Sequence, residues 1–553
     1  MIHAVSAIGL LLLLPMLALL FVGTTTFDQQ TLLHVARTTL PETTTVSGLL
    51  ALGTLAGTVM LGVASAWCIE RYRFPLRNTL SWALILPLAM PTYVIAYAYT
   101  DLLSFGAPIH LWLRDTLGFQ GRMPNVRSLP GAIILFSVVY YPYVYLIVRN
   151  AVADIPAATI ESARLLGHRP ASIFWHIVRP LLLPATVAGG MLVLMETLAD
   201  VGATYYFGLP TFSAGIYKTW FALGDRGAAL MLAVALLFII ATIHLIERHA
   251  RRRIRLVTTR AQRPWPPTTL PRGPGTLLAL VLMLPIVMGF LLPVSGLIWL
   301  LLREPEMTPT LHRFAEWARN SFTAGLLGAT LTLLLACAVA YGVRFAERHQ
   351  QRLLGGIASS LRFGYAVPGS VIALAVLWPV ARLDHALADL VGARSTLITS
   401  TMLGVLYAYL LRFFAVGYNG IEAGMQRITP NLDAAARSLG ASRFEVFRRV
   451  HVPLLWRSVA VAWLLLLIDV MKELPATLML RPFNFDTLAV ITQQLSEDER
   501  LAEAALPALA IVAIGTVPVI FISRLINKTR TSSQGDDTTR QPGISAQAAM
   551  QAA

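Results

Sequence analysis

The chain has 553 residues, of which 56% are hydrophobic and only 13% are charged. Soluble domains carry about 25% charged residues, so this composition excludes a water-soluble protein. The net charge of +15 would suit a nucleic-acid partner, but the aromatic residues lie inside apolar stretches and not among the basic ones. Basic residues that flank membrane spans explain the positive net charge without a nucleic-acid partner. The composition instead implies that the chain is surrounded by membrane lipid.

Apolar stretches of about 20 residues recur along the chain, and each is long enough to cross ~30 Å of hydrocarbon at ~1.5 Å per residue. We therefore predict an all-α, polytopic membrane protein with about twelve transmembrane helices. The first stretch lacks a basic start and a cleavage site, so we interpret it as a retained helix and not as a signal peptide. The predicted spans lie near residues 5–23, 46–69, 82–104, 129–149, 181–205, 228–247, 275–302, 320–343, 363–381, 396–418, 454–480 and 503–525.

Prolines inside two of these spans predict kinks or unwound turns: Pro87 and Pro91 in the first, Pro368 and Pro379 in the second. The two cysteines and eleven histidines show no spacing typical of metal ligands. We therefore expect no cofactor and no resident metal.

Lys and Arg gather in alternate loops, most densely in residues 248–272. Because positively charged loops stay in the cytoplasm, we expect both termini there. The basic, proline-rich segment 251–274 is interpreted as a cytoplasmic linker between two repeats, residues 1–250 and 275–530. The polar tail, 531–553, is expected to be a disordered cytoplasmic segment.

The two halves resemble each other at a nearly constant offset. Residues 161–167 resemble residues 434–440, and both continue with the same spacing to a proline, Pro180 and Pro453. Further matches before and after these, in the same order, indicate a duplication. Each copy holds about six spans, an even number, so we predict two parallel six-helix repeats with a pathway on the axis between them.

Each repeat also carries a segment between its fourth and fifth spans that is predicted to form a short helix of about three turns outside the membrane. In the first repeat Pro156 stands at the expected start and Gly167 at the expected end. In the second, Thr429 is the expected N-cap, Pro430 the first helical residue and Gly440 the C-terminal stop.

Arg164 and Arg437 match in position, so each short helix has a cation near its C-terminal end. Small residues along these helices would let another protein approach the backbone closely. An ordinary amphipathic connector is the alternative interpretation, which the duplicated spacing to the following proline disfavours.

The pattern Glu-x-Ala-x-x-x-Gly, followed at a fixed spacing by an apolar residue and a proline, resembles the EAA loop of binding-protein-dependent ABC importer permeases. The matching residues are Glu161, Ala163, Gly167, Ile177 and Pro180 in the first repeat, and Ala435, Ala436, Gly440, Val450 and Pro453 in the second. In the second copy Ala434 takes the place of the glutamate, and the nearest acid is Asp433.

This resemblance implies that the two loops are coupling helices, each docking in a cleft on a cytoplasmic ABC ATPase subunit. It also implies an ATPase dimer, an extracytoplasmic solute-binding protein and a bacterial inner (plasma) membrane location. Residues 472–489 and 195–202 resemble the ferric iron permeases of this superfamily, which are often fused twelve-span chains. Thiamine permeases share the plan, so thiamine or another small solute is the alternative substrate.

A P-loop needs the sequence Gly-Lys-Ser/Thr, and none of the three lysines, Lys218, Lys472 and Lys528, follows a glycine. ATP hydrolysis is therefore expected on a separate subunit. Motifs of zinc hydrolases and serine hydrolases are absent from the sequence, which disfavours an enzyme.

Five charged residues lie within spans at equivalent places: Glu196, Asp200, Asp469, Lys472 and Glu473. In each repeat the two acids are four residues apart and are predicted to share one helical face, and Lys472 can pair with Asp469. Either they form a buried polar network that fixes helix packing, or they line the translocation path or its gate. Carboxylates suit a hard cation such as Fe(III), but a substrate delivered by a binding protein needs no tight metal site here.

A parallel-repeat secondary transporter, driven by an ion gradient, would explain the repeat and the acids but not the paired coupling patterns.

Overall fold

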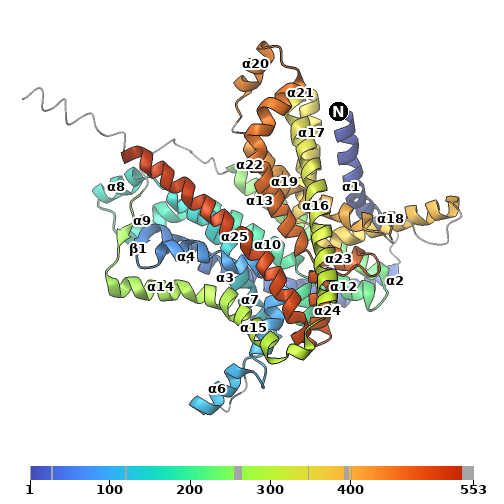
Figure 1. Ribbon diagram of the computed structural model, residues 1–553, viewed down its shortest axis with the longest axis horizontal. Helices are drawn as coiled ribbons and strands as arrows, with labels where there is room; N and C mark the ends of the chain where they lie inside the picture. The colour runs from blue at the N-terminus through green and yellow to red at the C-terminus, as the bar shows by residue number, and fades with distance from the viewer. Residues whose placement is uncertain are drawn as a thin grey trace, which may run out of the picture.

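The chain folds into helices throughout nearly all of the part that the structure describes (Figure 1). The computed structural model describes residues 2–25, 29–118, 121, 123–253, 265–346, 348–391, 398–399, 401–426 and 428–538. Within these residues, the strands are two short ones, which pair in parallel with Tyr72 opposite Thr268 and Arg73 opposite Thr269. The all-α, polytopic fold that the sequence predicts is confirmed.

The first half contains these elements, with η marking 3₁₀ or π turns. They are α1 Ile2–Thr25, α2 Gln29–Arg37, α3 Thr39–Arg71, β1 Tyr72–Arg73, α4 Arg77–Ala83, η1 Leu86–Ala89, α5 Thr92–Leu102, α6 Pro108–Leu117, α7 Leu129–Ala153, α8 Ala157–Leu165, α9 Pro170–Ile173, η2 Phe174–Val178, α10 Arg179–Ala199, α11 Gly202–Tyr206, α12 Phe212–Phe221 and α13 Arg226–Arg253.

The second half repeats most of this order. Its elements are β2 Thr268–Thr269, α14 Arg272–Ile286, η3 Val287–Leu291, α15 Leu292–Arg303, η4 Pro305–Met307, α16 Leu311–Phe345, α17 Arg348–Phe363, η5 Gly364–Ala366, α18 Gly369–Val391, α19 Leu403–Met425, α20 Pro430–Ser438, α21 Arg443–Val446, η6 Phe447–His451, α22 Val452–Met471, α23 Pro475–Leu480, α24 Leu488–Glu497 and α25 Leu501–Thr538.

Each predicted span overlaps at least one of these helices, and several spans are divided among two or three elements. Eight helices in the described part of the chain are long and apolar enough to cross a membrane. One further candidate is a bent pair, Arg77–Ala89 with Thr92–Leu102, and two shorter apolar helices, Ser6–Leu19 and Leu501–Val517, lie in the first and last predicted spans. The predicted span at 396–418 corresponds to α19.

The bent pair turns by 93° where prolines were expected to break the span. Pro91 stands at the N-cap of α5, and Met90 before it is extended, with ψ of 115°. A residue before proline is pushed out of the α region, so the break follows from the sequence. In the second repeat, α18 begins directly after Pro368, at the equivalent place.

The structure also shows a π turn two residues before a proline in three helices. The turns η2, η3 and η6 are followed by Pro180, Pro293 and Pro453. A proline ring clashes with the carbonyl four residues earlier and supplies no N–H, and a wider turn accommodates both. The two short helices α8 and α20 are therefore joined to the following span in the same way in both repeats.

The first span of each repeat packs against the other repeat, which the sequence did not reveal. Helix α1 packs against α17 and α18, while α14 packs against α4 and α15 against α5 (Figure 1). The last spans behave alike: α13 contacts α18, and α25 contacts η1 and α5. The two hydrophobic cores accordingly each contain side chains from both halves.

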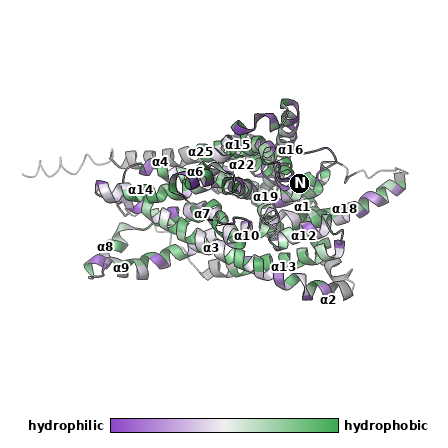
Figure 2. Cartoon of the chain, turned by 90° about the horizontal axis from the view of Figure 1, so that it is seen from below, coloured by the Kyte–Doolittle hydropathy of each residue, from purple (hydrophilic) through white to green (hydrophobic). Residues whose placement is uncertain are grey.

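Hydrophobic residues cover most of the helices, and hydrophilic residues gather at outer ends such as those of α9 and α18 (Figure 2). The C-terminal helix α25 continues to Thr538, so residues 532–538 are helical although the sequence predicted no regular structure there. A helix that is already formed adds one backbone hydrogen bond for each further residue, which favours its continuation. The rest of the tail and residues 254–264 of the linker lie outside the described residues.

Candidate functional site

The short helices α8 and α20 lie at the outer ends of the two repeats, away from α12, α23 and α24 (Figure 1). We call them the paired short helices. Pro156 occupies the N-cap of α8 and Thr429 that of α20, as predicted, although the Thr429 side chain makes no capping hydrogen bond.

Both helices end in the same glycine-dependent motif. In α8, the N–H of Gly167 donates to the carbonyl of Arg164 (2.9 Å), and that of His168 donates to the carbonyl of Ala163 (3.1 Å). The same two bonds recur at Gly440, and the φ angles of the two glycines are +80° and +84°. This left-handed conformation is readily adopted by glycine alone, so the predicted stops are confirmed.

The outward face of α8 carries charge and a large apolar side chain. Glu161 and Arg164 are exposed, whereas Ala163 is buried and packs inward. Leu166 is 79% exposed and its counterpart Leu439 is 88% exposed. Exposed leucines directly before the capping glycines were not singled out from the sequence, although the repeated Leu-Gly pair was visible there. The two leucines therefore occupy matching exposed places in the two repeats.

In α20, the exposed positions carry no acid, and the one acid of the helix faces inward. Ala434, Ala435 and Arg437 are exposed and Ala436 is half-buried, whereas Asp433 is buried. Asp433 therefore does not replace the missing outward glutamate of this repeat.

Asp433 instead anchors α20 to the helix bundle. One carboxylate oxygen lies 2.7 Å from Nε2 of His451, and the other lies 3.0 Å from Nη2 of Arg344. Arg344 also donates to the carbonyls of Met425 and Ile428, each at 3.0 Å. Burial alone would raise the pKa of Asp433, but the hydrogen bonds from His451 and Arg344 outweigh it and hold that pKa below its ordinary value.

The five charged residues predicted within spans all line one cavity of about 140 Å³ between the repeats. The first repeat contributes residues of α5, α7 and α10, and the second contributes residues of α19, α22 and α23. The polar side chains of the lining are Thr92, Tyr93, Tyr140, Tyr143, Glu196, Asp200, Tyr365, Arg412, Asp469, Lys472 and Glu473.

The two acids of each repeat do not share one helical face, which corrects the prediction. Helix α10 ends at Ala199 and α22 at Met471, so Asp200 and Glu473 follow the helix ends. In the second repeat Pro475 explains the stop, because its ring excludes the carbonyl of Met471 from a helical bond.

Asp200 and Glu473 hold the short helices that follow. Asp200 accepts from the N–H of Thr204 at 3.0 Å and from the hydroxyl of Thr92. Glu473 accepts from the N–H groups of Ala476 and Thr477, both at 2.9 Å. These carboxylates satisfy free N–H groups at the starts of α11 and α23, which is a structural role.

The other charges face one another across the cavity. Lys472 lies 3.4 Å from Asp469, as predicted, and Glu196 accepts a hydrogen bond of 3.3 Å from Tyr365 of the other repeat. Arg412 of α19 also lines the cavity, and its Nη1 is buried without a hydrogen-bond partner among the residues that the structure describes. Sequence reasoning missed Arg412, although it is a charged residue within a predicted span.

The cavity thus holds four carboxylates and two cations, with acids in excess. Among the described residues, no group of three or more His, Cys, Asp and Glu side chains is placed to hold a metal ion. The arrangement can stabilise a passing cation by nearby negative charge, and its salt links can rearrange as the repeats move.

A sequence model of one family matches this chain twice. The family is described as "Binding-protein-dependent transport system inner membrane component", and it matches residues 53–256 and 338–531. The two matched segments fall on equivalent helices of the two repeats, and each includes one of the paired short helices.

The chain is also similar to several curated proteins that are described as transport system permeases. The chain is 25% identical, over 94% of its length and 96% of the relative, to the Fe(3+)-transport system permease protein FbpB 2 of Haemophilus influenzae. It is 26% identical to the molybdenum transport system permease protein ModB of Escherichia coli, over 34% of this chain and 84% of that protein. A probable sulfate transport system permease protein of Zygnema circumcarinatum is 29% identical over 26% of this chain and 48% of the relative.

Proposed function

The chain belongs to the family of inner membrane components of binding-protein-dependent transport systems, and we propose that it is the fused, two-repeat permease of an ATP-driven importer of ferric iron. The observation that carries this proposal is the pair of short helices α8 and α20. They have the same capping, the same π-turn connection and an exposed leucine at the same place. Such duplicated contact elements suit two copies of one partner.

We propose that this partner is a cytoplasmic ABC ATPase dimer, with one subunit docking on each short helix. Leu166 and Leu439 would enter an apolar recess of the ATPase, while Glu161, Arg164 and Arg437 contact its rim. The basic loop between the repeats supports a cytoplasmic location for this face and for both termini. An extracytoplasmic solute-binding protein would then deliver the substrate at the opposite face.

Glu196, Asp469, Lys472 and Arg412 form the gate of the translocation path in this proposal. They line one cavity, they come from both repeats, and two of them already make a salt link that can open. Asp200 and Glu473 contribute by holding α11 and α23, which continue the cavity wall.

Ferric iron is favoured as the substrate by two independent observations. The relative named for Fe(3+) transport matches along nearly the whole of both chains. The cavity between the repeats is lined by four carboxylates, which suit a hard cation.

Reconstitution in proteoliposomes with a candidate ABC ATPase and a candidate iron-binding protein tests the coupling role. Iron-loaded binding protein should stimulate ATP hydrolysis, and Leu166→Asp or Leu439→Asp should abolish the stimulation while leaving the exposed helices folded. Leu117→Asp is the matched control, because this exposed leucine ends α6, outside the paired short helices. Full stimulation in both docking variants would overturn the assignment.

Uptake measurements test the substrate. Vesicles with ATP inside should accumulate radiolabelled ferric iron and neither thiamine nor molybdate, each offered with the binding protein. Accumulation of thiamine or molybdate in place of iron would show that the chain is a permease for another solute.

A further inference from the structure

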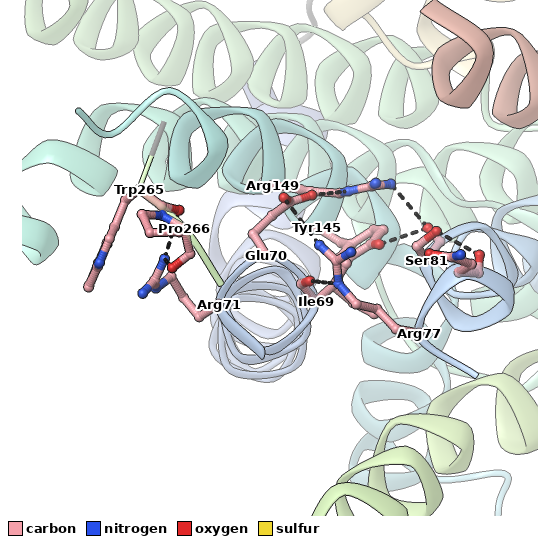
Figure 3. A network of polar contacts seen from close by, with 10 residues as sticks. Ile69, Glu70, Arg71, Arg77, Ser81, Tyr145, Arg149, Trp265 and Pro266 are labelled. Atoms are coloured by element: carbon pink, nitrogen blue, oxygen red, sulfur yellow. Dashed lines mark hydrogen bonds and ion pairs between the residues drawn. The ribbon is translucent and has the colours of Figure 1, made fainter. Parts of the chain in front are cut away.

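The end of the linker between the repeats is bound to Arg71, at the end of α3 (Figure 3). Arg71, the last residue of α3, is only 5% exposed, and its Nη1 donates to the carbonyls of Trp265 and Pro266, both at 3.0 Å. The guanidinium carbon lies 3.2 Å from the centre of the Trp265 ring. The N–H of Trp265 donates to the carbonyl of Ile155 (3.3 Å), two residues before α8 begins.

Neighbouring contacts hold this linker segment in place. Its next residues pair with the chain after α3 through the strands β1 and β2, and the N–H of Leu270 donates to the carbonyl of Arg73 at 3.0 Å. The ring of Trp265 also packs edge-on against Trp67, with centroids 5.9 Å apart. The end of α3 is itself fixed by Glu70, which lies 2.7 Å from Arg149 of α7 (Figure 3).

In the second repeat, the segment that leads into the short helix is held without any contact from the part of the linker that the structure describes. Arg344 lies one residue before the end of α16, much as Arg71 ends α3, and it donates directly to the carbonyl of Ile428, the counterpart of Ile155. It also binds Asp433 of α20. The counterpart of Asp433 is Ile160, which cannot accept a hydrogen bond.

We infer that the linker segment Trp265–Pro266 is a positioning element for α8, which replaces the acid that the first repeat lacks. A buried guanidinium needs acceptors, and Ile160 and Val178 offer none where Asp433 and His451 stand in the second repeat. The linker supplies two carbonyls and an aromatic face to Arg71 and bonds the segment that leads into α8. The linker thus has two roles: it joins the two repeats, and it holds the docking helix α8 of the first repeat in place.

The role of α8 as a docking helix rests on the proposed function, but its anchoring by the linker does not. Hydrogen–deuterium exchange of the purified permease without its partners therefore tests the inference alone. Trp265→Ala should speed exchange of residues 157–166 by about tenfold, the effect of losing a partly desolvated cation–π contact. Exchange of residues 430–439 should stay unchanged. Trp265→Phe keeps an aromatic face and should give a smaller effect, and Trp456→Ala, at an exposed tryptophan of α22, is the control.

A rescue experiment separates anchoring from general damage. Ile160→Asp with Val178→His, added to Trp265→Ala, places beside Arg71 an acid and a histidine like those beside Arg344 and should slow exchange of α8 again. A protease site inserted at residue 260 should leave that exchange unchanged after cleavage, because the docked segment stays in place through its own contacts. Unchanged exchange of α8 in Trp265→Ala, equal acceleration at both short helices, failed rescue, or faster exchange after cleavage would each overturn the inference. Failure of the proposed function would appear differently, as a wild-type complex that iron-loaded binding protein does not stimulate.

Discussion

The Nε2 atom of His451 lies 2.7 Å from a carboxylate oxygen of Asp433, and this contact ties the second short helix to the span that follows it. An ionised carboxylate can only accept, so Nε2 carries the proton of this bond. With Arg344 on the other oxygen, Asp433 is held from two elements, α16 and the π turn η6. The orientation of α20 is thereby set by the bundle and not by the helix itself.

We expect Asp433→Ala to loosen α20 strongly. Removing one partner of a buried ion pair leaves Arg344 without its counter-charge and costs ~3 kcal/mol. Hydrogen exchange of residues 430–439 should therefore become roughly a hundredfold faster. Asp154→Ala removes an exposed acid just before α8 and serves as the control. Exchange of α20 that is no faster than in the control would contradict the anchoring role.

The same anchor predicts a pH dependence. Hydrogen bonds from His451 and Arg344 overcome the effect of burial and hold the pKa of Asp433 below its ordinary value of 3.8. The carboxylate therefore stabilises α20 fully above pH ~4, and this contribution is lost as the pH falls through the lowered pKa. The difference in α20 exchange between wild type and Asp433→Asn should be constant at pH 5–8 and shrink towards pH 3. A difference that persists undiminished in strong acid would show that another group provides the anchor.

Glycine at the end of each short helix should be needed for coupling. Alanine at the φ angles of Gly167 and Gly440 costs ~1–2 kcal/mol, so either substitution should fray the last turn and displace the exposed leucine before it. We expect Gly167→Ala and Gly440→Ala each to reduce binding-protein-stimulated ATP hydrolysis several-fold in proteoliposomes. Gly118→Ala imposes the same strain at the end of α6, where φ is +65°, and should leave the stimulation intact. If all three variants lost the same share of the stimulated ATP hydrolysis, the loss would be due to backbone strain in general and not to the two short helices.

The cavity carboxylates should divide into two classes. Glu473→Gln and Asp200→Asn remove charged acceptors from buried N–H groups and should destabilise the purified protein by ~2 kcal/mol, seen as a lower unfolding temperature in detergent. Glu196→Gln and Asp469→Asn should leave the unfolding temperature close to that of wild type and slow iron uptake about tenfold, equivalent to ~1.4 kcal/mol of barrier. If all four variants changed stability alone, the cavity would be a structural network and no gate.

Packing of the first helix against the second repeat can be tested at a single glycine. A side chain on Gly9 of α1 would collide with Ile357 of α17. Gly9→Leu should therefore cost ~1–3 kcal/mol and speed hydrogen exchange in residues 350–363, although the substitution lies some 350 residues away in the chain. Gly48→Leu meets open space in α3 and is the control. Faster exchange confined to the first repeat would refute the cross-packing.

The spans, the duplication and both short helices could all be predicted from the amino-acid sequence. These depend on local signals: apolar runs of about 20 residues, prolines at Pro91 and Pro180, and the stops at Gly167 and Gly440. Each signal acts within a turn or a span, so it is readable without knowing what packs against it.

Which distant groups meet could not be predicted from the sequence and follows from the packing of the helices. This packing placed Asp200 and Glu473 beyond their helix ends as caps and brought Arg412 to the cavity. It also turned Asp433 inward and laid Trp265 on Arg71. Each of these outcomes depends on side chains that lie far apart in the sequence, or on where a buried helix breaks. Hydropathy and residue spacing do not distinguish one such arrangement from another. The two repeats therefore share a plan set by sequence, while their different anchors arise from contacts that only folding creates.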